Sequence, residues 1–205
     1  MDQKAYQSYA VSLSAAYALH GDRDVFDVDL DRITDDKAKK VFWIHLYHAE
    51  VSQEQVPLGL LSRTAYFRRR RFSLQGYDWS LDDIEHGILR ANRRSPAWTF
   101  RQFSPRDPRR RYCVSACDGR IHFALNCGAA SCPPVRTYSL EHADRELSAA
   151  EASFSSQEFL ADDTQRHITC SKIYSWYRGD FPSSYLNDPK YRGYRVKLKP
   201  YSWKS

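Results

Sequence analysis

The chain has 205 residues, of which 42% are apolar and 14% aromatic, and these large side chains are enough for the core of a folded domain. The composition therefore excludes a disordered protein, and no segment has the pattern of a membrane span or a signal peptide. The formal net charge of +6 favours anionic partners without excluding other functions. We expect a cytoplasmic protein in which most of the five cysteines are reduced.

The N-terminal part is predicted to be helical. Apolar residues recur at helical spacing over 5–19, and "GDRD" then ends this first helix. A second helix is predicted over 35–56. Its middle, "VFWIHLYHAEV", is apolar on nearly every side, which is typical of a buried helix. His45 and His48 lie three residues apart and therefore share one face of it.

The next segment is predicted to contain a strand and a helix. "TAYFRRRRFSL" has the pattern of an extended chain. "SLDDIEHGILR" has the pattern of a helix, with Ser80 and Asp83 as a capping pair at its start. The apolar residues of this helix form one stripe, and the polar residues, among them Glu85 and His86, flank that stripe.

The second half of the chain mixes short helices and strands. Residues 92–111 hold three prolines and many arginines, which predicts a loop. "YCVSACDGRIHFALNC" alternates like a hairpin that turns at Asp118 and Gly119. The remaining predicted elements are a helix over 140–154, a strand over 166–170, a helix over 171–181 and a strand over 194–203. Because this order lacks a regular alternation, we expect a single α+β domain over 1–205, with a small antiparallel sheet packed against several helices.

Five stretches resemble the domain-of-unknown-function family 547 and occur in that family's order: "FWIHLYHA", "SLDDIEHGILR", "DGRIHFALNCGAASCPP", "SKIYSWYRGDF" and "YSW". They span residues 42–203. The resemblance implies that residues 35–205 form the family-matching core, preceded by an N-terminal helix and loop over 1–34. It implies a shared fold and a shared polar site, but no settled activity.

The family pattern points to a set of polar and small residues as that site: Glu85, His86, Arg90, His122, Asn126, Cys127, Gly128, Ser131 and Cys132. The chain departs from the family in its first block, where asparagines are typical and this sequence has His45 and His48.

Our leading hypothesis is an enzyme, a cysteine-dependent hydrolase or acyl transferase that acts on an amide or ester and requires no cofactor. A thiol nucleophile is activated by a helix start or an imidazole, and the imidazole needs a third group to orient it. Cys127 is the favoured nucleophile, and Cys132, which precedes a predicted helix start, is the alternative. His122 or His86 would serve as the base.

Neighbouring residues would support this reaction. Glu85 or Asn126 would orient the base, and backbone N–H groups of the turn 128–131 would face an oxyanion. Arg90, together with Asn126 and Ser131, would bind the substrate, a small molecule or peptide that carries an anionic group in one version of the hypothesis. Each of these residues, taken alone, also has a structural interpretation as a buried or hydrogen-bonded side chain.

A metal-dependent enzyme is the second hypothesis. His45 and His48 would bind a transition metal together with Glu85, His86 or His122, since a nitrogen-rich set suits zinc, iron or copper. The alternative is that both histidines form ordinary hydrogen bonds. The cysteine spacings differ from the C-x-x-C of structural zinc and of thioredoxin-like sites, so a cysteine metal site or a reversible redox pair is the weaker interpretation.

A non-catalytic interaction domain is the third hypothesis. Arginine runs at 68–71, 93–94 and 109–111 would bind an acidic partner. Nucleic acid is the less favoured partner, because no recognition-helix, zinc-finger or RNA-recognition signature accompanies these runs.

Overall fold

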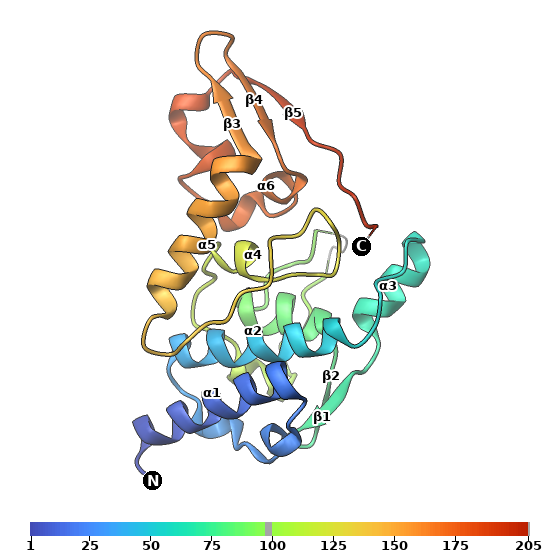
Figure 1. The fold of residues 1–205 in the computed structure, drawn as a ribbon, viewed down its shortest axis with the longest axis vertical. Coiled ribbons are helices and arrows are strands. Elements are labelled where there is room, and N and C mark those ends of the chain that lie inside the picture. Colours follow the sequence, from blue (N-terminus) through green and yellow to red (C-terminus); the bar gives the residue numbers. More distant parts are fainter. Residues whose placement is uncertain (97–99, 205) are drawn as a thin grey trace.

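The structure, a computed structural model, describes residues 1–96 and 100–204. It is elongated, with a helical part at one end and a three-stranded sheet at the other (Figure 1). The helix α5, Ala143–Glu158, runs between these two ends and was predicted over 140–154. The mixture of helices with two small sheets confirms the α+β class. The loop predicted over 92–111 includes residues 97–99, which lie outside the described residues.

Two long helices build the N-terminal part. α1, Gln3–His20, begins at the N-cap Asp2 and ends at Gly21, whose φ of 74° favours glycine. α2, Asp36–Ser52, packs against α1, and every residue from Val41 to Val51 is buried. Both predicted helices are confirmed, as is the burial that the continuous apolar run indicated.

The arginine-rich stretch after these helices is part helix and part strand. α3, Leu60–Arg68, precedes β1, Phe72–Leu74, which pairs with β2, Tyr77–Trp79, in an antiparallel hairpin. The prediction of a fully extended chain here is therefore wrong for its first half. Tyr66 gives the reason: its side chain is buried and its hydroxyl donates to a carbonyl at the end of α2, so tertiary packing stabilises the helix.

The "SLDDIEHGILR" stretch is helical, as predicted, but in an unusual form. The Asp83 amide donates to the Ser80 hydroxyl oxygen, and the Ser80 amide donates to the Asp83 carboxylate, so the predicted capping pair is confirmed. Asp83–Leu89 then forms a π-helix, whose backbone hydrogen bonds span one more residue than those of an α-helix. π-Helical turns are rare in proteins overall, but those that do occur are often found at functional sites.

The stretch predicted as a hairpin forms short helical turns instead. A 3-10 turn, Pro108–Tyr112, opens it, and the single-turn helix α4, Ile121–Ala124, lies where the second strand was expected. Asp118 stabilises the turn that leads into α4, since its carboxylate accepts a hydrogen bond from the amide of the N-cap Arg120 and pairs with Lys40 at 2.8 Å. All four residues of α4 are buried, so the alternation in the sequence does not mark a one-sided strand.

A three-stranded sheet forms the C-terminal end. β3, Phe159–Asp162, pairs antiparallel with β4, His167–Cys170, and β4 pairs in parallel with β5, Arg195–Leu198. Two of these strands were predicted, β5 in a longer form, whereas β3 was not. Because β4 has one antiparallel and one parallel neighbour, this sheet is mixed, whereas a purely antiparallel sheet was expected.

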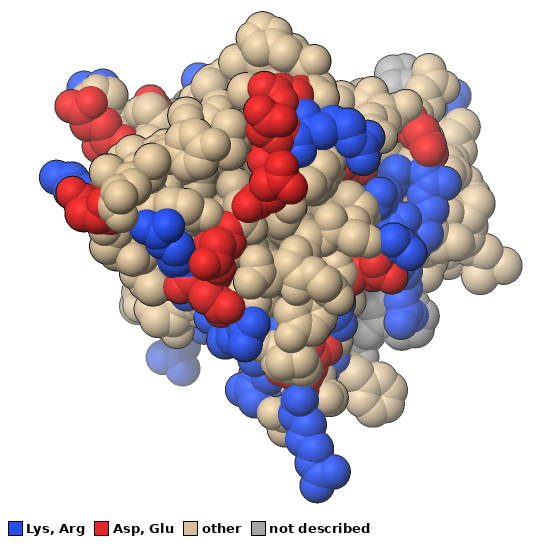
Figure 2. Space-filling model, turned by 90° about the horizontal axis from the view of Figure 1, so that it is seen from below, with Lys and Arg blue, Asp and Glu red and all other residues tan. Residues whose placement is uncertain are grey.

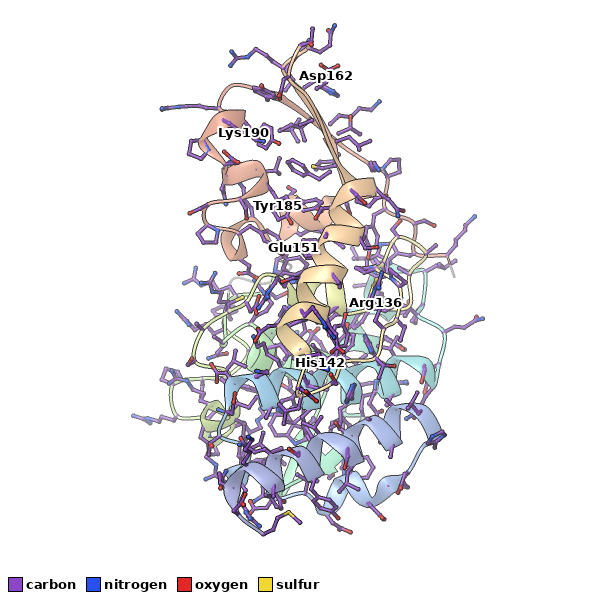
Figure 3. The ribbon with its side chains drawn as sticks, turned by 60° about the vertical axis from the view of Figure 1, so that its left-hand side comes forward. Arg136, His142, Glu151, Asp162, Tyr185 and Lys190 are labelled. Carbon is purple, nitrogen blue, oxygen red and sulfur yellow. A yellow bond between two sulfur atoms is a disulfide. The ribbon has the colours of Figure 1, made fainter. Side chains whose placement is uncertain are left out.

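Aromatic packing joins this sheet to the rest of the chain. α6, Lys172–Trp176, and a 3-10 turn, Arg178–Asp180, follow β4 where one longer helix was predicted. Tyr185 lies against α5, and its hydroxyl donates to Glu151 at 2.6 Å (Figure 3). Phe123 of α4 belongs to the aromatic cluster of this end, whereas the other apolar residues of α4 belong to the core of the N-terminal part. The two cores therefore meet at α4.

Candidate functional site

A cavity of about 300 Å³ opens where the two cores meet. Its wall combines residues from α2, α3, the π-helix, α4, α6 and the C-terminal segment. Side chains with polar groups or sulfur line this wall, among them Tyr47, Asp82, Glu85, His86, His122, Cys127, Cys132, Tyr177 and Tyr201. All five residues predicted to be catalytic are among them, and the volume suits a small molecule or one side chain of a peptide.

α4 places His122 against Asp180. The ring is buried, and its Nε2–H donates to the Asp180 carboxylate at 2.8 Å. Tyr177 stacks on the ring with the two centroids 3.7 Å apart, which fixes the ring plane. Because Nε2 carries the proton, Nδ1 holds a lone pair. Burial lowers the pKa of His122 although Asp180 and Glu85 oppose this effect, so the ring is neutral and can accept a proton.

The π-helix places His86 beside Arg90. Arg90 Nη1 donates to His86 Nδ1 at 3.1 Å, so the ring proton lies on Nε2. Burial lowers the pKa of His86 to about 4, and the ring is neutral near pH 7. Arg90 is itself buried and donates from Nε to Asp180 at 2.6 Å. Asp180 therefore orients one histidine directly and the other through Arg90, which supports the site instead of facing a substrate.

Glu85 holds a negative charge in the cavity wall. The Tyr177 hydroxyl donates to Glu85 Oε1 at 2.5 Å, and the Tyr47 hydroxyl lies 3.4 Å from Oε2. Burial alone would raise the pKa of Glu85, but the His86 and His122 rings in their protonated forms, the Tyr177 hydroxyl and the Arg90 guanidinium outweigh it, and the pKa is lowered. The carboxylate is therefore ionised at neutral pH.

Asp82 is the second carboxyl group of the cavity. Its residue surface is 9% exposed, and no hydrogen bond from residues 1–96 or 100–204 reaches its carboxylate. His86 Nε2 lies 3.9 Å from Asp82 Oδ1. Burial and the charge of Glu85 raise the pKa of Asp82 to about 7. The cavity therefore contains a carboxyl group that exchanges its proton near neutral pH.

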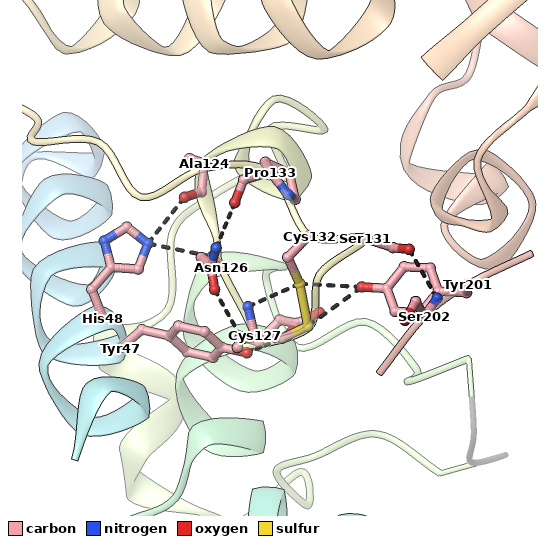
Figure 4. The surroundings of a disulfide bond; sticks show 12 residues. Tyr47, His48, Ala124, Asn126, Cys127, Ser131, Cys132, Pro133, Tyr201 and Ser202 are labelled. Carbon is pink, nitrogen blue, oxygen red and sulfur yellow. Dashed lines mark hydrogen bonds between the residues drawn. A yellow bond between two sulfur atoms is a disulfide. The ribbon is translucent and has the colours of Figure 1, made fainter. Parts of the chain in front are cut away.

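A disulfide joins Cys127 and Cys132 at the cavity wall (Figure 4). The Cys127 amide donates to Cys132 Sγ at 3.0 Å, and the Tyr201 hydroxyl lies 3.1 Å from Cys132 Sγ and 3.4 Å from Cys127 Sγ. Two of the five cysteines are therefore bonded to each other, and most of the cysteines are free thiols, as expected from the sequence. The helix expected directly after Cys132 begins only at Ala143, so Cys132 does not lie at a helix start. The three free cysteines are Cys113, Cys117 and Cys170.

The comparison with protein families decides the affiliation of the chain. The family model described as "Protein of unknown function, DUF547" matches residues 30–154, which is more than half of the sequence. The chain belongs to this family. The DUF547 match contains the π-helix, α4 and the disulfide, whereas Tyr177, Asp180 and Tyr201 lie beyond its end. Searches of curated proteins and of solved structures found no match.

Two residues of the DUF547 pattern hold the disulfide loop in place. Asn126 Nδ2 donates to the Pro133 carbonyl at 2.7 Å, and Asn126 Oδ1 accepts from the Gly128 amide at 2.7 Å (Figure 4). Ser131 exchanges hydrogen bonds with Ser202. The amides of Gly128 and Ser131 are thereby occupied, so these two do not form the oxyanion site expected of the turn, and the side chains of Asn126 and Ser131 bind the chain itself.

The two histidines that depart from the DUF547 pattern lie outside the cavity wall. His45 Nδ1 lies 3.0 Å from the Ser14 hydroxyl, and His48 Nε2 lies 3.0 Å from the Ala124 carbonyl. Burial lowers the pKa of each ring to about 4. Within the described residues, no group of three His, Cys, Asp or Glu side chains is placed to hold a metal ion. The metal hypothesis therefore has no ligand set in that part of the chain.

Sequence reasoning missed several residues of this site. Asp180 and Tyr177 belong to the "SKIYSWYRGDF" stretch, which resembled the family, yet neither residue was among the predicted site residues. Asp82 directly precedes the capping residue Asp83, and Tyr47 lies in an apolar run. The one usable signal was the family resemblance of the stretch that carries Asp180.

The arginine runs are largely paired with acidic residues. Such pairs join Arg69 to Glu54, Arg70 to Asp78, Arg93 to Asp180, Arg109 to Asp107 and Arg111 to Asp31. On the face drawn in Figure 2, acidic side chains interrupt the basic ones, so this face is not a continuous basic patch. Among the described helices, none has the length and apolar character needed to cross a bilayer.

Proposed function

We propose that the protein is a thiol-dependent hydrolase or acyl transferase that acts on an amide or ester bound in the cavity. One observation carries this proposal: a histidine oriented by a buried carboxylate lines the same cavity as two cysteine sulfurs. A nucleophile, a base and a group that orients the base are the parts that covalent acyl transfer requires. Here these parts are a cysteine, His122 and Asp180.

The contacts favour Cys132 over Cys127 as the nucleophile. Cys132 Sγ accepts a hydrogen bond from the Cys127 amide at 3.0 Å and lies closer to the Tyr201 hydroxyl than Cys127 Sγ does. Hydrogen-bond donors around a sulfur stabilise its thiolate form and lower the thiol pKa. In the reduced protein, Cys132 would attack the carbonyl carbon of the substrate, and His122 Nδ1 would hold the thiol proton and return it to the leaving group.

The disulfide makes the activity depend on reduction. Neither sulfur is a nucleophile while the bond exists, and a dithiol or phosphine reductant must supply two electrons to release both thiols. We therefore expect the oxidised protein to be inactive and the reduced protein to be active. In the oxidised protein Cys127 is then the disulfide partner of Cys132 and keeps it from reacting.

Hydrolysis of an activated ester, p-nitrophenyl acetate, tests the proposal. The protein is assayed before and after reduction with a phosphine, and mass spectrometry follows acylation of the protein. Cys132→Ser should abolish acylation and turnover, and His122→Asn should lower kcat/KM by about 100-fold or more, the usual contribution of a general base. Asp180→Asn should lower kcat/KM by a similar factor, because the imidazole then loses its orientation.

Cys113→Ser is the matched control, since Cys113 is free and does not line the cavity. This variant should retain the activity of the reduced parent. Turnover that persists in the double variant Cys127→Ser/Cys132→Ser would overturn the proposal, and so would equal acylation of the oxidised and reduced proteins.

The bonded pair itself favours a second candidate, thiol–disulfide exchange with a dithiol substrate. In that reaction the substrate loses two electrons and becomes a disulfide, while Cys127 and Cys132 become thiols. Catalysed oxidation of a model dithiol peptide, lost in both Cys127→Ser and Cys132→Ser but retained in His122→Asn, would favour this candidate over acyl transfer.

A further inference from the structure

The charge inside the cavity is opposite to that of the protein as a whole. The net charge of the chain is +6, yet two carboxyl groups, Asp82 and Glu85, line the cavity with one arginine, Arg63. Both imidazoles in the wall are neutral at pH 7, as described above. The Arg63 guanidinium lies on the same wall, 4.0 Å above the ring of Trp203, and donates to a backbone carbonyl. The interior therefore favours a cation over the anionic substrate considered from the sequence.

Asp82 lacks a hydrogen-bond donor on the protein. Its side chain is 12% exposed, and no described residue donates a hydrogen bond to its carboxylate, although a carboxylate so far removed from solvent is normally paired or hydrogen-bonded. Glu85 differs, because two tyrosine hydroxyls lie against its oxygens. A ligand that brings a positively charged N–H donor would give Asp82 the partner that it lacks and would add a charge-assisted hydrogen bond.

Aromatic rings form a continuous wall beside these carboxyl groups. Trp176 and Tyr201 have their centroids 4.8 Å apart, and Tyr201 and Trp203 have theirs 5.0 Å apart. Trp176 is 38% exposed, so this wall reaches solvent, and the rings line the same cavity as the two carboxyl groups. Ring faces attract organic cations and bind the apolar part of an amphipathic ligand.

We propose that the cavity binds a small amine in its protonated form, with the ammonium group against Asp82 and Glu85 and an apolar or aromatic portion against Trp176 and Tyr201. A bare metal ion fits less well, because the described residues offer no group of three ligands and a metal ion would not use the ring faces. As a statement about substrate class this inference rests on the proposed function. Binding itself needs no turnover.

Isothermal titration with 2-phenylethylamine, compared with its neutral analogue 2-phenylethanol, tests this inference. We expect the amine to bind the wild-type protein at least about tenfold more tightly than the alcohol, since each charge-assisted contact with a desolvated carboxylate exceeds that ratio. Asp82→Asn should weaken amine binding by about tenfold and leave alcohol binding within about twofold. Glu141→Gln, which removes the same charge at an exposed site, is the matched control and should change neither.

Equal affinity for amine and alcohol in the wild-type protein would overturn the inference without any variant. Unchanged amine binding in Asp82→Asn would do the same. The measurement is made on the oxidised protein, in which the acyl-transfer reaction is blocked. Amine binding without ester turnover after reduction would therefore refute the proposed function alone, and turnover without amine preference would refute this inference alone.

Discussion

Two pairs of buried histidines lie in this protein, and they differ in what holds their rings. His45 and His48 project from α2 and contact a serine hydroxyl and a backbone carbonyl. His86 and His122 line the cavity, and each forms a hydrogen bond with a charged side chain, His86 with Arg90 and His122 with Asp180. All four rings are at most 8% exposed, and burial lowers the pKa of every one.

Burial and residue type therefore do not distinguish a histidine that lines the cavity from one that does not. The difference is that His86 and His122 each have a charged partner on one ring nitrogen and line the cavity, whereas His45 and His48 do neither. Asp180 is the residue on which this arrangement depends, because it binds His122 and Arg90 together. Four experiments compare the two histidine regions, from the largest expected effect to the smallest.

Asp180→Ala should have the largest effect on stability. Its carboxylate accepts hydrogen bonds from His122, Arg90 and Arg93, and the first two are buried. Removal leaves the Arg90 guanidinium buried without its counter-charge, which should lower the free energy of unfolding by about 3 to 5 kcal/mol. Urea denaturation at pH 7 measures the change. A loss below about 1 kcal/mol would show that the cavity histidines do not depend on this charge.

Asp82→Asn should stabilise the protein at alkaline pH. The folded-state pKa of about 7 lies above the ordinary value of Asp, so the wild-type carboxyl group favours the folded state at low pH and loses this contribution as the pH rises through 7. Asn stays neutral throughout. The variant should gain about 2 to 4 kcal/mol relative to wild type at pH 8 and about zero at pH 4.

Denaturation curves recorded from pH 4 to pH 8 give this difference directly. Glu85, Asp83, Arg68 and His86 are the charged or titratable groups that act on Asp82 through space. A constant difference between the two proteins across this range would contradict the raised pKa.

His48→Asn should flatten the acid dependence of stability. The folded-state pKa of about 4 lies below the ordinary value of histidine, so the neutral ring favours the folded state near pH 7, and this contribution decreases as the pH falls from about 6.5 toward 4. Between pH 7 and pH 5 the variant should lose about 1 to 2 kcal/mol less than the wild-type protein. Identical losses in thermal denaturation at the two pH values would contradict this expectation.

Ser14→Ala should have the smallest effect. The Ser14 hydroxyl donates to the Val11 carbonyl and lies 3.0 Å from His45 Nδ1. Its loss removes one neutral hydrogen bond to a buried ring and should lower the free energy of unfolding by about 1 kcal/mol. A loss as large as that of Asp180→Ala, measured by the same urea denaturation, would mean that the stability of the protein depends equally on the partners of both histidine pairs.

Local patterns predicted the parts of the fold whose side chains have one dominant environment. The apolar run of α2 indicated a buried helix, and the Ser80–Asp83 pair marked the start of the helix that bears Glu85 and His86. The hairpin prediction failed at α4, because both faces of that segment are buried and alternation then carries no information. The prediction of an extended chain failed at α3, because Tyr66 packs against the end of α2 and stabilises a helix there.

The sequence predicted which residues line the cavity better than it predicted which residues contact one another there. Glu85, His86, His122, Cys127 and Cys132 do line one cavity, although they come from separate elements. The orienting carboxylate was assigned to Glu85, yet His122 donates its hydrogen bond to Asp180, which lies 58 residues further along the chain. Pairing over such a distance is fixed by tertiary packing, and neither spacing nor periodicity reports it.

The disulfide between Cys127 and Cys132 closes a very small covalent ring. The two cysteines are five positions apart, so the bond restricts few conformations of the unfolded chain, and the loop-entropy model assigns it a stabilisation of about 2 kcal/mol. Hydrogen bonds from Asn126 hold the same turn independently of the sulfurs. We therefore expect reduction of this pair to cost little of the free energy of unfolding and to leave the turn at the cavity wall in place.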